Sequence, residues 1–218
     1  VVMGHILRTE HPTAPSMTKN NRTHGKDPAD EVTVSHSQYP SRRPRRNRTK
    51  ASVRDLVRES RITADDLIQP LFVHDGDGPD VAIGSMPGMY RHNVPGLLER
   101  CGRARRAGVK AVALFPKVSD TLKDETGREA WNEDGLIPNV VRSLKAAYPD
   151  LLVITDVALD PYSSLGQDGI VMDGDIHNER TIEALVQQAA CQAAAGADLV
   201  APSDMMDGRV GAIRRALD

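Results

Sequence analysis

The sequence has 218 residues, of which 39% are hydrophobic and only 3% aromatic, so a core would be built from aliphatic side chains. This length allows one large domain or two small ones. The formal net charge of -2 gives no global electrostatic field that would favour nucleic acid or a membrane surface as a partner. Neither of the two cysteines, Cys101 and Cys191, has a Cys or His at ligand spacing, so we expect no zinc site and no disulfide.

Residues 1–50 are polar and show no sustained periodicity, so we expect a largely disordered N-terminal arm. The arm ends in a basic run over residues 42–50, which has no interleaved aromatic residues, so we expect a solvated segment that pairs with a neighbouring subunit, not with nucleic acid. Four acidic residues argue against a transit peptide: Glu10, Asp27, Asp30 and Glu31. No apolar run reaches the roughly 20 residues of a membrane span, and we expect a cytoplasmic protein, or a plastid one in a photosynthetic eukaryote.

From residue 51 the sequence alternates between amphipathic segments and continuous apolar runs. The predicted helices span residues 51–60, 94–109, 136–149, 178–197 and 208–218. The predicted buried strands span residues 66–73, 110–116, 151–159 and 198–204. Gly108 and Gly196 are predicted helix ends and Asn178 a helix N-cap, while Pro70 is a mild objection to the first strand.

Strands that are apolar throughout are typical of a parallel sheet with both faces covered, so the alternation predicts an α/β fold of repeated βα units. Two architectures are compatible with it, an open doubly wound sheet and a barrel of eight βα units. No G-x-G-x-x-G motif follows the first strand, which weakens a dinucleotide-binding interpretation. Four βα units would make half of a barrel, with an open four-stranded sheet.

Polar residues gather just after three of the predicted strands, at the rim where barrel enzymes hold their catalytic groups. They are Lys117 and Ser119, Asp156 and Asp160, and Ser203 and Asp204. Asp168 follows in the same turn-rich segment as Asp156 and Asp160. We expect these three aspartates to line a pocket, although aspartates often only cap turns.

Four segments carry a resemblance to one family: SMPGMYRHNV, LFPKVSDTLKDETG, DVALDPYSSLGQDG and APSDMMDGRVGAIRRALD. In this order, from about residue 42 to residue 218, they resemble porphobilinogen synthases, also called 5-aminolevulinate dehydratases. The resemblance implies a (β/α)8 TIM barrel, with residues 51–218 as its N-terminal half, and an arm that wraps a partner subunit in a homo-octamer. It also implies a lyase of haem and chlorophyll biosynthesis that condenses two 5-aminolevulinate molecules to porphobilinogen and releases two waters.

The resemblance also bears on the metal. Zinc-dependent members have three cysteines at the positions of Ala158, Asp160 and Asp168, so this sequence resembles the zinc-independent class, which magnesium often activates. Magnesium prefers oxygen ligands and keeps several waters. Asp160 and Asp168 could therefore hold magnesium, or could orient the ammonium groups of the substrate directly.

The family mechanism uses two lysines, each of which forms a Schiff base with one substrate ketone, and both lie beyond the position that matches Asp218. Of the lysines in this sequence, only Lys117 lies near the end of a strand, and it matches no catalytic position. We therefore expect the chain to be an inactive N-terminal part of the enzyme. In the intact enzyme Asp156 would stand beside the first lysine, and Ser203 and Asp204 would line the same cavity.

Two other interpretations remain open. The chain could be a natural short paralogue without catalytic activity, which joins full-length subunits through its arm. It could also be a different βα enzyme that uses Asp156 and Asp160 as acid and base, although the sequence offers no credible nucleophile for one.

Overall fold

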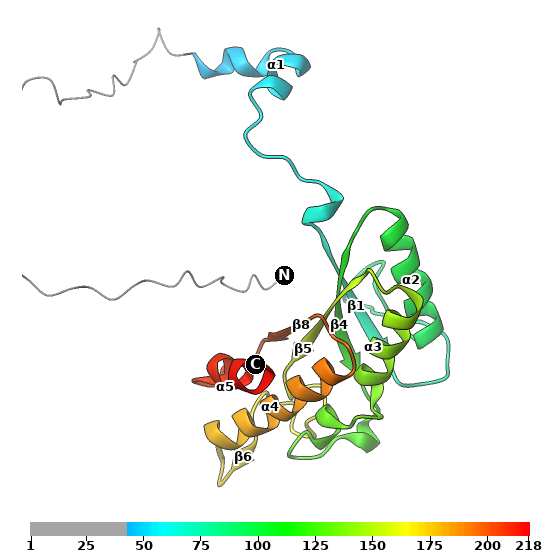
Figure 1. The fold of residues 1–218 in the computed structure, drawn as a ribbon, viewed down its shortest axis with the longest axis vertical. Coiled ribbons are helices and arrows are strands. Elements are labelled where there is room, and N and C mark those ends of the chain that lie inside the picture. Colours follow the sequence, from blue (N-terminus) through cyan, green and yellow to red (C-terminus); the bar gives the residue numbers. More distant parts are fainter. Residues whose placement is uncertain (1–42) are drawn as a thin grey trace, which may run out of the picture. The chain divides into compact units, whose positions relative to one another are not determined.

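The computed structural model describes residues 43–218, so most of the expected disordered arm lies outside the described residues. The chain divides into two units at Arg58. The described part of the first unit contains a 3-10 helix, η1 (Pro44–Arg48), and a short α-helix, α1 (Ala51–Leu56) (Figure 1). Proline at the first helical position favours this start, so the basic run contains one helical turn where we expected disorder.

The second unit, residues 59–218, contains a six-stranded sheet and a separate hairpin. The strands are β1 (Ile68–His74), β2 (Val81–Ala82), β3 (Tyr90–His92), β4 (Ala111–Lys117), β5 (Leu152–Val157), β6 (Val171–Met172), β7 (Asp175–Ile176) and β8 (Leu199–Pro202). The helices are η2 (Ala64–Asp66), α2 (Val94–Arg106), η3 (Asp120–Leu122), η4 (Arg128–Trp131), α3 (Leu136–Ala147), α4 (Asn178–Ala194) and α5 (Arg209–Leu217). None of the helices in residues 43–218 is long and apolar enough to cross a membrane.

Every predicted strand and helix is present, and the predicted strands pair in parallel in the order β1-β4-β5-β8. The expectation of four strands was wrong, because β3 pairs in parallel with the outer edge of β1 and β2 pairs antiparallel with β3. These two strands are too short to show a hydrophobic period. The short β3 also explains why Pro70 is tolerated: β3 pairs with β1 only at Phe72 and Val73, so Pro70 has a strand on one side only.

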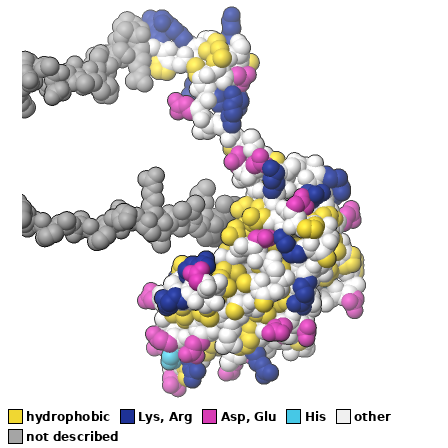
Figure 2. All heavy atoms as spheres, in the orientation of Figure 1, with side chains coloured by type: hydrophobic (Ala, Val, Ile, Leu, Met, Phe, Trp, Pro, Cys, Tyr) yellow, Lys and Arg dark blue, Asp and Glu magenta, His cyan; other side chains and the backbone are white. Residues whose placement is uncertain are grey.

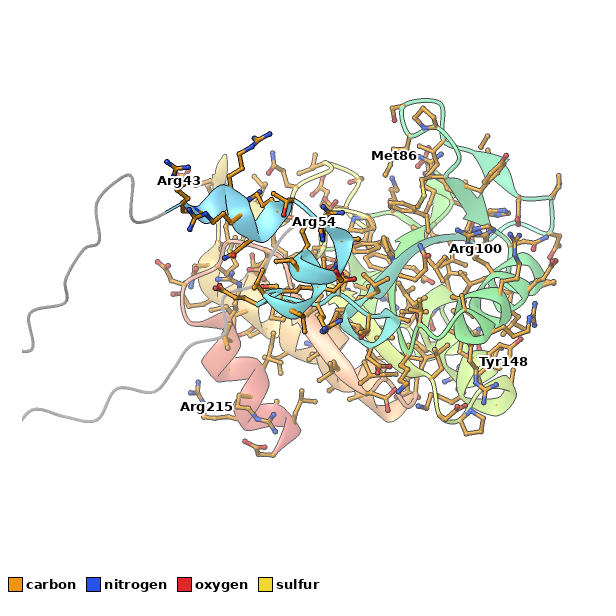
Figure 3. The ribbon with its side chains drawn as sticks, turned by 90° about the horizontal axis from the view of Figure 1, so that it is seen from above. Arg43, Arg54, Met86, Arg100, Tyr148 and Arg215 are labelled. Carbon is orange, nitrogen blue, oxygen red and sulfur yellow. The ribbon has the colours of Figure 1, made fainter. Side chains whose placement is uncertain are left out.

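Helices α2, α3 and α4 cover one face of the sheet. Alternate strand residues point to this face and are almost fully buried, among them Leu71 in β1, Leu114 in β4 and Val153 in β5. The helix residues that pack against them are Leu97, Cys101, Ile137, Val140, Val141 and Leu144. Tyr148, labelled in Figure 3, donates a hydrogen bond of 3.1 Å to the Leu98 carbonyl and so joins the end of α3 to α2.

The other face of the sheet is only partly covered within residues 59–218. Phe72 and Phe115 lie in register on it, with ring centroids 5.6 Å apart. Ile154 lies opposite Leu199, and Leu199 is 51% exposed. In Figure 2 hydrophobic side chains form patches among polar and charged ones on the visible side of this unit. In a closed barrel this face would line the interior.

Both predicted glycine helix ends are confirmed, because Gly108 has φ +94° and Gly196 has φ +105° just after α2 and α4. The predicted N-cap of α4 was wrong by one residue. His177 is the cap, and its Nδ1 accepts a hydrogen bond from the Arg180 N–H. Asn178 is already helical, and its side chain exchanges two hydrogen bonds with the main chain of Asp207, at 2.9 and 3.2 Å. Asn178 therefore ties α4 to the loop before α5.

The two cysteines are free, as the sequence predicts. Cys101 is fully buried in α2, and this burial raises the pKa of its thiol to about 12. A thiol in this state is a small core side chain and not a nucleophile.

Candidate active site

The parallel pairing of β5 and β8 brings two predicted site residues together. Asp156 lies opposite Ala201 near the end of β5, and Ser203 follows the last residue of β8. The Ser203 hydroxyl donates a hydrogen bond of 2.7 Å to the Asp156 carboxylate, while its main-chain N–H donates one of 3.2 Å to the Val157 carbonyl. These two bonds fix one oxygen of Asp156 at the carboxyl end of the sheet.

Asp156 points away from the helices. Its neighbours Thr155 and Val157 are fully buried, so the alternation of the strand places Asp156 on the partly uncovered face. Burial raises the pKa of Asp156, although the Ser203 hydrogen bond opposes this effect. The charges of Asp168 and Asp204 raise the pKa of Asp156 further. The predicted aspartates thus lie near enough to affect one another electrostatically.

The Asp160 carboxyl lies close to Asp168. Burial raises the pKa of Asp160 to about 6, and the charge of the Asp168 carboxylate is the second cause. The charge of Asp156 acts in the same direction. Near neutral pH the Asp160 carboxyl can therefore both give and accept a proton, which is the property required of a general acid or base.

Asp204 is engaged by the start of α5. Its side chain is fully buried, one oxygen accepts a hydrogen bond of 2.7 Å from the Met206 N–H, and the other lies 3.0 Å from Nε of Arg209. Burial raises the pKa of Asp204, while the Met206 N–H and the Arg209 guanidinium oppose the rise. Asp204 thus orders the loop after β8, and its charge reaches Asp156 only through space.

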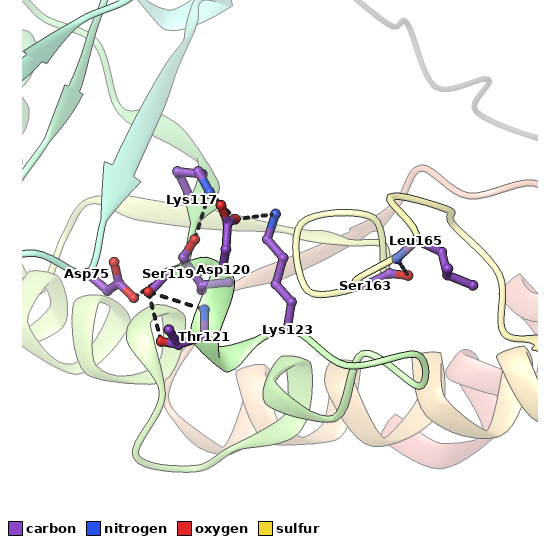
Figure 4. A network of polar contacts seen from close by, with 9 residues as sticks. Asp75, Lys117, Ser119, Asp120, Thr121, Lys123, Ser163 and Leu165 are labelled. Atoms are coloured by element: carbon purple, nitrogen blue, oxygen red, sulfur yellow. Dashed lines mark hydrogen bonds and ion pairs between the residues drawn. The ribbon is translucent and has the colours of Figure 1, made fainter.

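Lys117 and Ser119 order the loop after β4 (Figure 4). The Lys117 ammonium lies 2.9 Å from the Asp120 carboxylate, and the Lys123 ammonium lies 3.0 Å from the same oxygen. The Ser119 N–H donates a hydrogen bond of 2.7 Å to Asp75, which joins this loop to the end of β1. The structure shows no hydrogen bond or ion pair between a lysine of residues 43–218 and the aspartates of β5 and its loop.

Asp124, which the sequence analysis did not single out, supports the segment that carries Asp160. The Asp124 N–H donates to the Tyr162 carbonyl at 3.3 Å, and the Ser164 N–H donates to the Asp124 carbonyl at 2.9 Å. The Asp124 carboxylate also accepts hydrogen bonds from the main chain of Thr126 and Arg128. The loops after β4 and β5 therefore brace each other. The only sequence signal was an Asp two residues before Thr, which is common in turns.

The sequence model of the family described as "Delta-aminolevulinic acid dehydratase" matches residues 41–218. The chain belongs to the delta-aminolevulinic acid dehydratase family. The resemblance that the motifs indicated is therefore confirmed, and with it the assignment to an α/β fold of the (β/α)8-barrel class.

Relatives of the chain carry the same family name. The chloroplastic delta-aminolevulinic acid dehydratase of Glycine max is 55% identical over 179 residues, which are 81% of this chain and 43% of that protein. The chloroplastic enzyme of Chlamydomonas reinhardtii is 48% identical over 211 residues, or 94% of this chain and 53% of that protein. The chain thus spans about half the length, or less, of these curated relatives.

A solved structure shares the fold. It is the delta-aminolevulinic acid dehydratase (porphobilinogen synthase) of Toxoplasma gondii ME49 in complex with the reaction product porphobilinogen. The identity is 52%, the TM-score is 0.79, and the match covers 81% of this chain and 51% of that chain. The likeness therefore extends over most of the described residues.

The predicted site aspartates do not line either of two hollows in residues 59–218. A cleft of about 520 Å³ follows β1 and includes His74, Asp75 and Asn93, and a hollow of about 220 Å³ lies beside β3. Neither contains Asp156 or Asp160. Within residues 59–218 the sheet is open beside β8, and Asp156 stands at the carboxyl end of this open sheet.

The side chains near Asp160 limit which metal ion could bind there. Within residues 43–218 no group of three or more His, Cys, Asp or Glu side chains is arranged to bind a metal ion. Ala158 has no donor atom in its side chain, and Asp160 and Asp168 supply only hard oxygen donors.

Proposed function

We propose that this chain forms one wall of the active site of a porphobilinogen synthase, which condenses two 5-aminolevulinate molecules to porphobilinogen and releases two waters. The hydrogen bond of 2.7 Å between Ser203 and Asp156 carries the proposal, because it places a fixed, buried carboxylate at the end of a barrel strand. The name of the Toxoplasma gondii structure, which holds porphobilinogen, supports the same reaction.

The geometry indicates how the wall would act. Among the described residues Ser203 is the one side-chain donor to the Asp156 carboxylate, and the Val157 N–H also acts on it, so the carboxylate keeps lone pairs that can accept a hydrogen bond from a substrate ammonium or from a reacting amine. Asp160, with a pKa of about 6, would move protons during the loss of water. The family reaction also needs amine nucleophiles, and Lys117 and Lys123 are instead engaged by Asp120.

A chimera tests the proposal. Residues 41–218 would replace the aligned segment of the Glycine max relative, and the unmodified relative is the control. We expect this Glycine max chimera to convert 5-aminolevulinate to porphobilinogen, measured as product formed per active site. A folded chimera that forms no porphobilinogen while the unmodified relative is active would refute the proposed function.

We propose further that the activity needs no zinc and that magnesium binds at Asp160 and Asp168. Magnesium is often held by one or two carboxylates and keeps several waters, which is compatible with a site that has no third protein carboxylate. When bound, the ion would supply positive charge and ordered water. With only Asp160 and Asp168 as protein ligands, the magnesium ion would bind weakly and exchange readily.

The Glycine max chimera is expected to keep its activity after treatment with a zinc-selective chelator. The reason is the absence of thiolates at Ala158, Asp160 and Asp168, where zinc would need soft ligands. The measurement is the rate of porphobilinogen formation before and after chelation. Loss of activity that zinc restores and magnesium does not would contradict this prediction.

Replacing Asp160 by asparagine in the chimera is expected to raise Tm near neutral pH but not in acid. In the folded protein the pKa of Asp160 is raised to about 6, whereas in the unfolded chain it is about 4. The folded state therefore favours the protonated carboxyl, and this contribution to stability is complete below about pH 4 and is lost as the pH rises through about 6. Asparagine keeps the shape and cannot ionise. Thermal unfolding would be followed at several pH values with a chelator present, and a difference in Tm that is independent of pH would show that Asp160 ionises normally.

The exposed Asp150 provides the control for this series. Its carboxylate is paired with Arg105 at 2.8 Å, and that hydrogen bond lowers the pKa of Asp150. Asp150→Asn should therefore bring no gain in Tm as the pH rises.

We also propose that the protein acts in plastids and assembles as a homo-oligomer through its arm, up to an octamer. The relatives named above are chloroplastic by name, which supports the location. Most of the arm lies outside the described residues, so the proposal on assembly rests on the family resemblance. We expect neither nucleic acid nor a membrane as a partner, given the net charge of -2.

A further inference from the structure

Helix α4 buries two glutamines on the face that packs against β5. Gln188 and Gln192 lie one turn apart and are 1% and 0% exposed. Glutamine is seldom fully buried, since its amide must find hydrogen-bond partners to offset the loss of water. Two of them on one helix face therefore call for an explanation.

Both amides donate to main-chain carbonyls at the end of β5. Nε2 of Gln192 donates to the Asp156 carbonyl at 3.0 Å, and Nε2 of Gln188 donates to the Ala158 carbonyl at 3.2 Å. The two carbonyls lie on either side of Val157, where β5 turns into the loop that carries Asp160. The glutamines thus hold the strand at the point where the candidate site begins.

The sheet cannot supply the hydrogen bond to the Asp156 carbonyl. β4 and β5 pair only as far as Leu114 and Thr155, and the Leu152 N–H donates to the Lys110 carbonyl. If that register continued, the donor to the Asp156 carbonyl would be residue 116. Residue 116 is a proline, which has no N–H. The Gln192 amide takes the place of the missing ladder donor.

The remaining oxygens of the two amides show that apolar packing is not their role. Within residues 43–218, Oε1 of Gln188 and Oε1 of Gln192 are buried and have no hydrogen-bond partner. An unsatisfied buried oxygen costs free energy, and an apolar side chain of the same size would avoid that cost. An apolar side chain could not donate a hydrogen bond to the carbonyl of Asp156 or of Ala158, and the amides do.

We infer that Gln188 and Gln192 are positioning residues for the carboxylates of the site. By fixing the main chain at Asp156 and Ala158, they keep the Asp156 carboxylate at Ser203 and direct the following loop so that Asp160 meets Asp168. The inference rests on the proposed function. Neither glutamine touches the carboxylates themselves, so both act through the strand.

The experiment replaces Gln192 by methionine in the Glycine max chimera. Methionine has a similar length and volume but cannot donate a hydrogen bond. We expect kcat to fall at least about tenfold with KM changed less than about threefold, because a displaced carboxylate impairs the chemical step more than binding. Amide hydrogen exchange of residues 157–163 should become faster.

Leu185→Ala is the matched control. Leu185 is fully buried in the same helix and packs in the core, so its truncation destabilises the protein while leaving both glutamine donors in place. It should lower Tm at least as much as Gln192→Met and lower kcat less.

Two results would overturn the inference: a kcat for Gln192→Met that falls no further than for Leu185→Ala, or exchange of residues 157–163 that stays at the parental rate. If the parental chimera forms no porphobilinogen, the proposed function fails on its own. The exchange comparison then still decides whether the glutamines fix the end of β5.

Discussion

Replacing Asp156 by alanine in the Glycine max chimera is expected to lower kcat for porphobilinogen formation at least about a hundredfold. The carboxylate is buried at the end of β5, and Ser203 holds one of its oxygens at 2.7 Å. A carboxylate fixed in this way beside a reacting amine contributes through proton transfer and charge, and alanine removes both. The measurement is steady-state turnover, with circular dichroism and Tm to show that the fold is intact.

Two further variants separate charge from structure. Asp156→Asn keeps an oxygen for the Ser203 hydroxyl but removes the charge, so it should lose nearly as much activity as Asp156→Ala. Asp150→Ala removes an exposed carboxylate whose partner is Arg105 and should leave kcat unchanged. Near-normal turnover of Asp156→Ala would show that Asp156 only ends a strand.

A polypeptide of residues 1–218 alone is expected to form no porphobilinogen and to self-associate. Its sheet is open, because β8 pairs with β5 and with no other strand of the described part. Phe72, Phe115 and Ile154 lie on the uncovered face, and Leu199 on the edge strand is 51% exposed. An exposed apolar face next to unpaired main-chain groups favours association.

Light scattering after gel filtration would measure the association, and an assay with 5-aminolevulinate would measure the activity. Leu199→Lys should shift the polypeptide toward monomer, because the charge lies on the open edge strand. Val210→Lys is the control, since Val210 is 56% exposed but lies on helix α5 and not on the edge strand. A monomer that unfolds cooperatively and forms porphobilinogen would disprove both expectations.

Much of the fold could be predicted because each main strand is a continuous apolar run and each helix has an apolar face. That Asp156 and Ser203 lie at the same rim could also be predicted, since each stands at the end of a predicted strand, but their hydrogen bond could not. The link between Asp204 and Arg209 could not be predicted, because it depends on the path of the loop between them.

The buried glutamines could not be predicted for a related reason. In the sequence Gln188 looks like any polar residue on the exposed side of an amphipathic helix. Gln188 is buried because its amide donates a hydrogen bond to the carbonyl of Ala158, which lies thirty positions away in the chain. Strands β2 and β3 escaped prediction because two or three residues show no period.

The pair of hydrogen bonds between Asn178 and Asp207 has a consequence for local unfolding. It ties the first turn of α4 to the segment that leads into α5, so fraying of α5 removes a main-chain partner from α4. The two helices also pack against each other along the sheet. We therefore expect α4 and α5 to open together, so that the loop after β8 becomes exposed to solvent only when α4 opens as well.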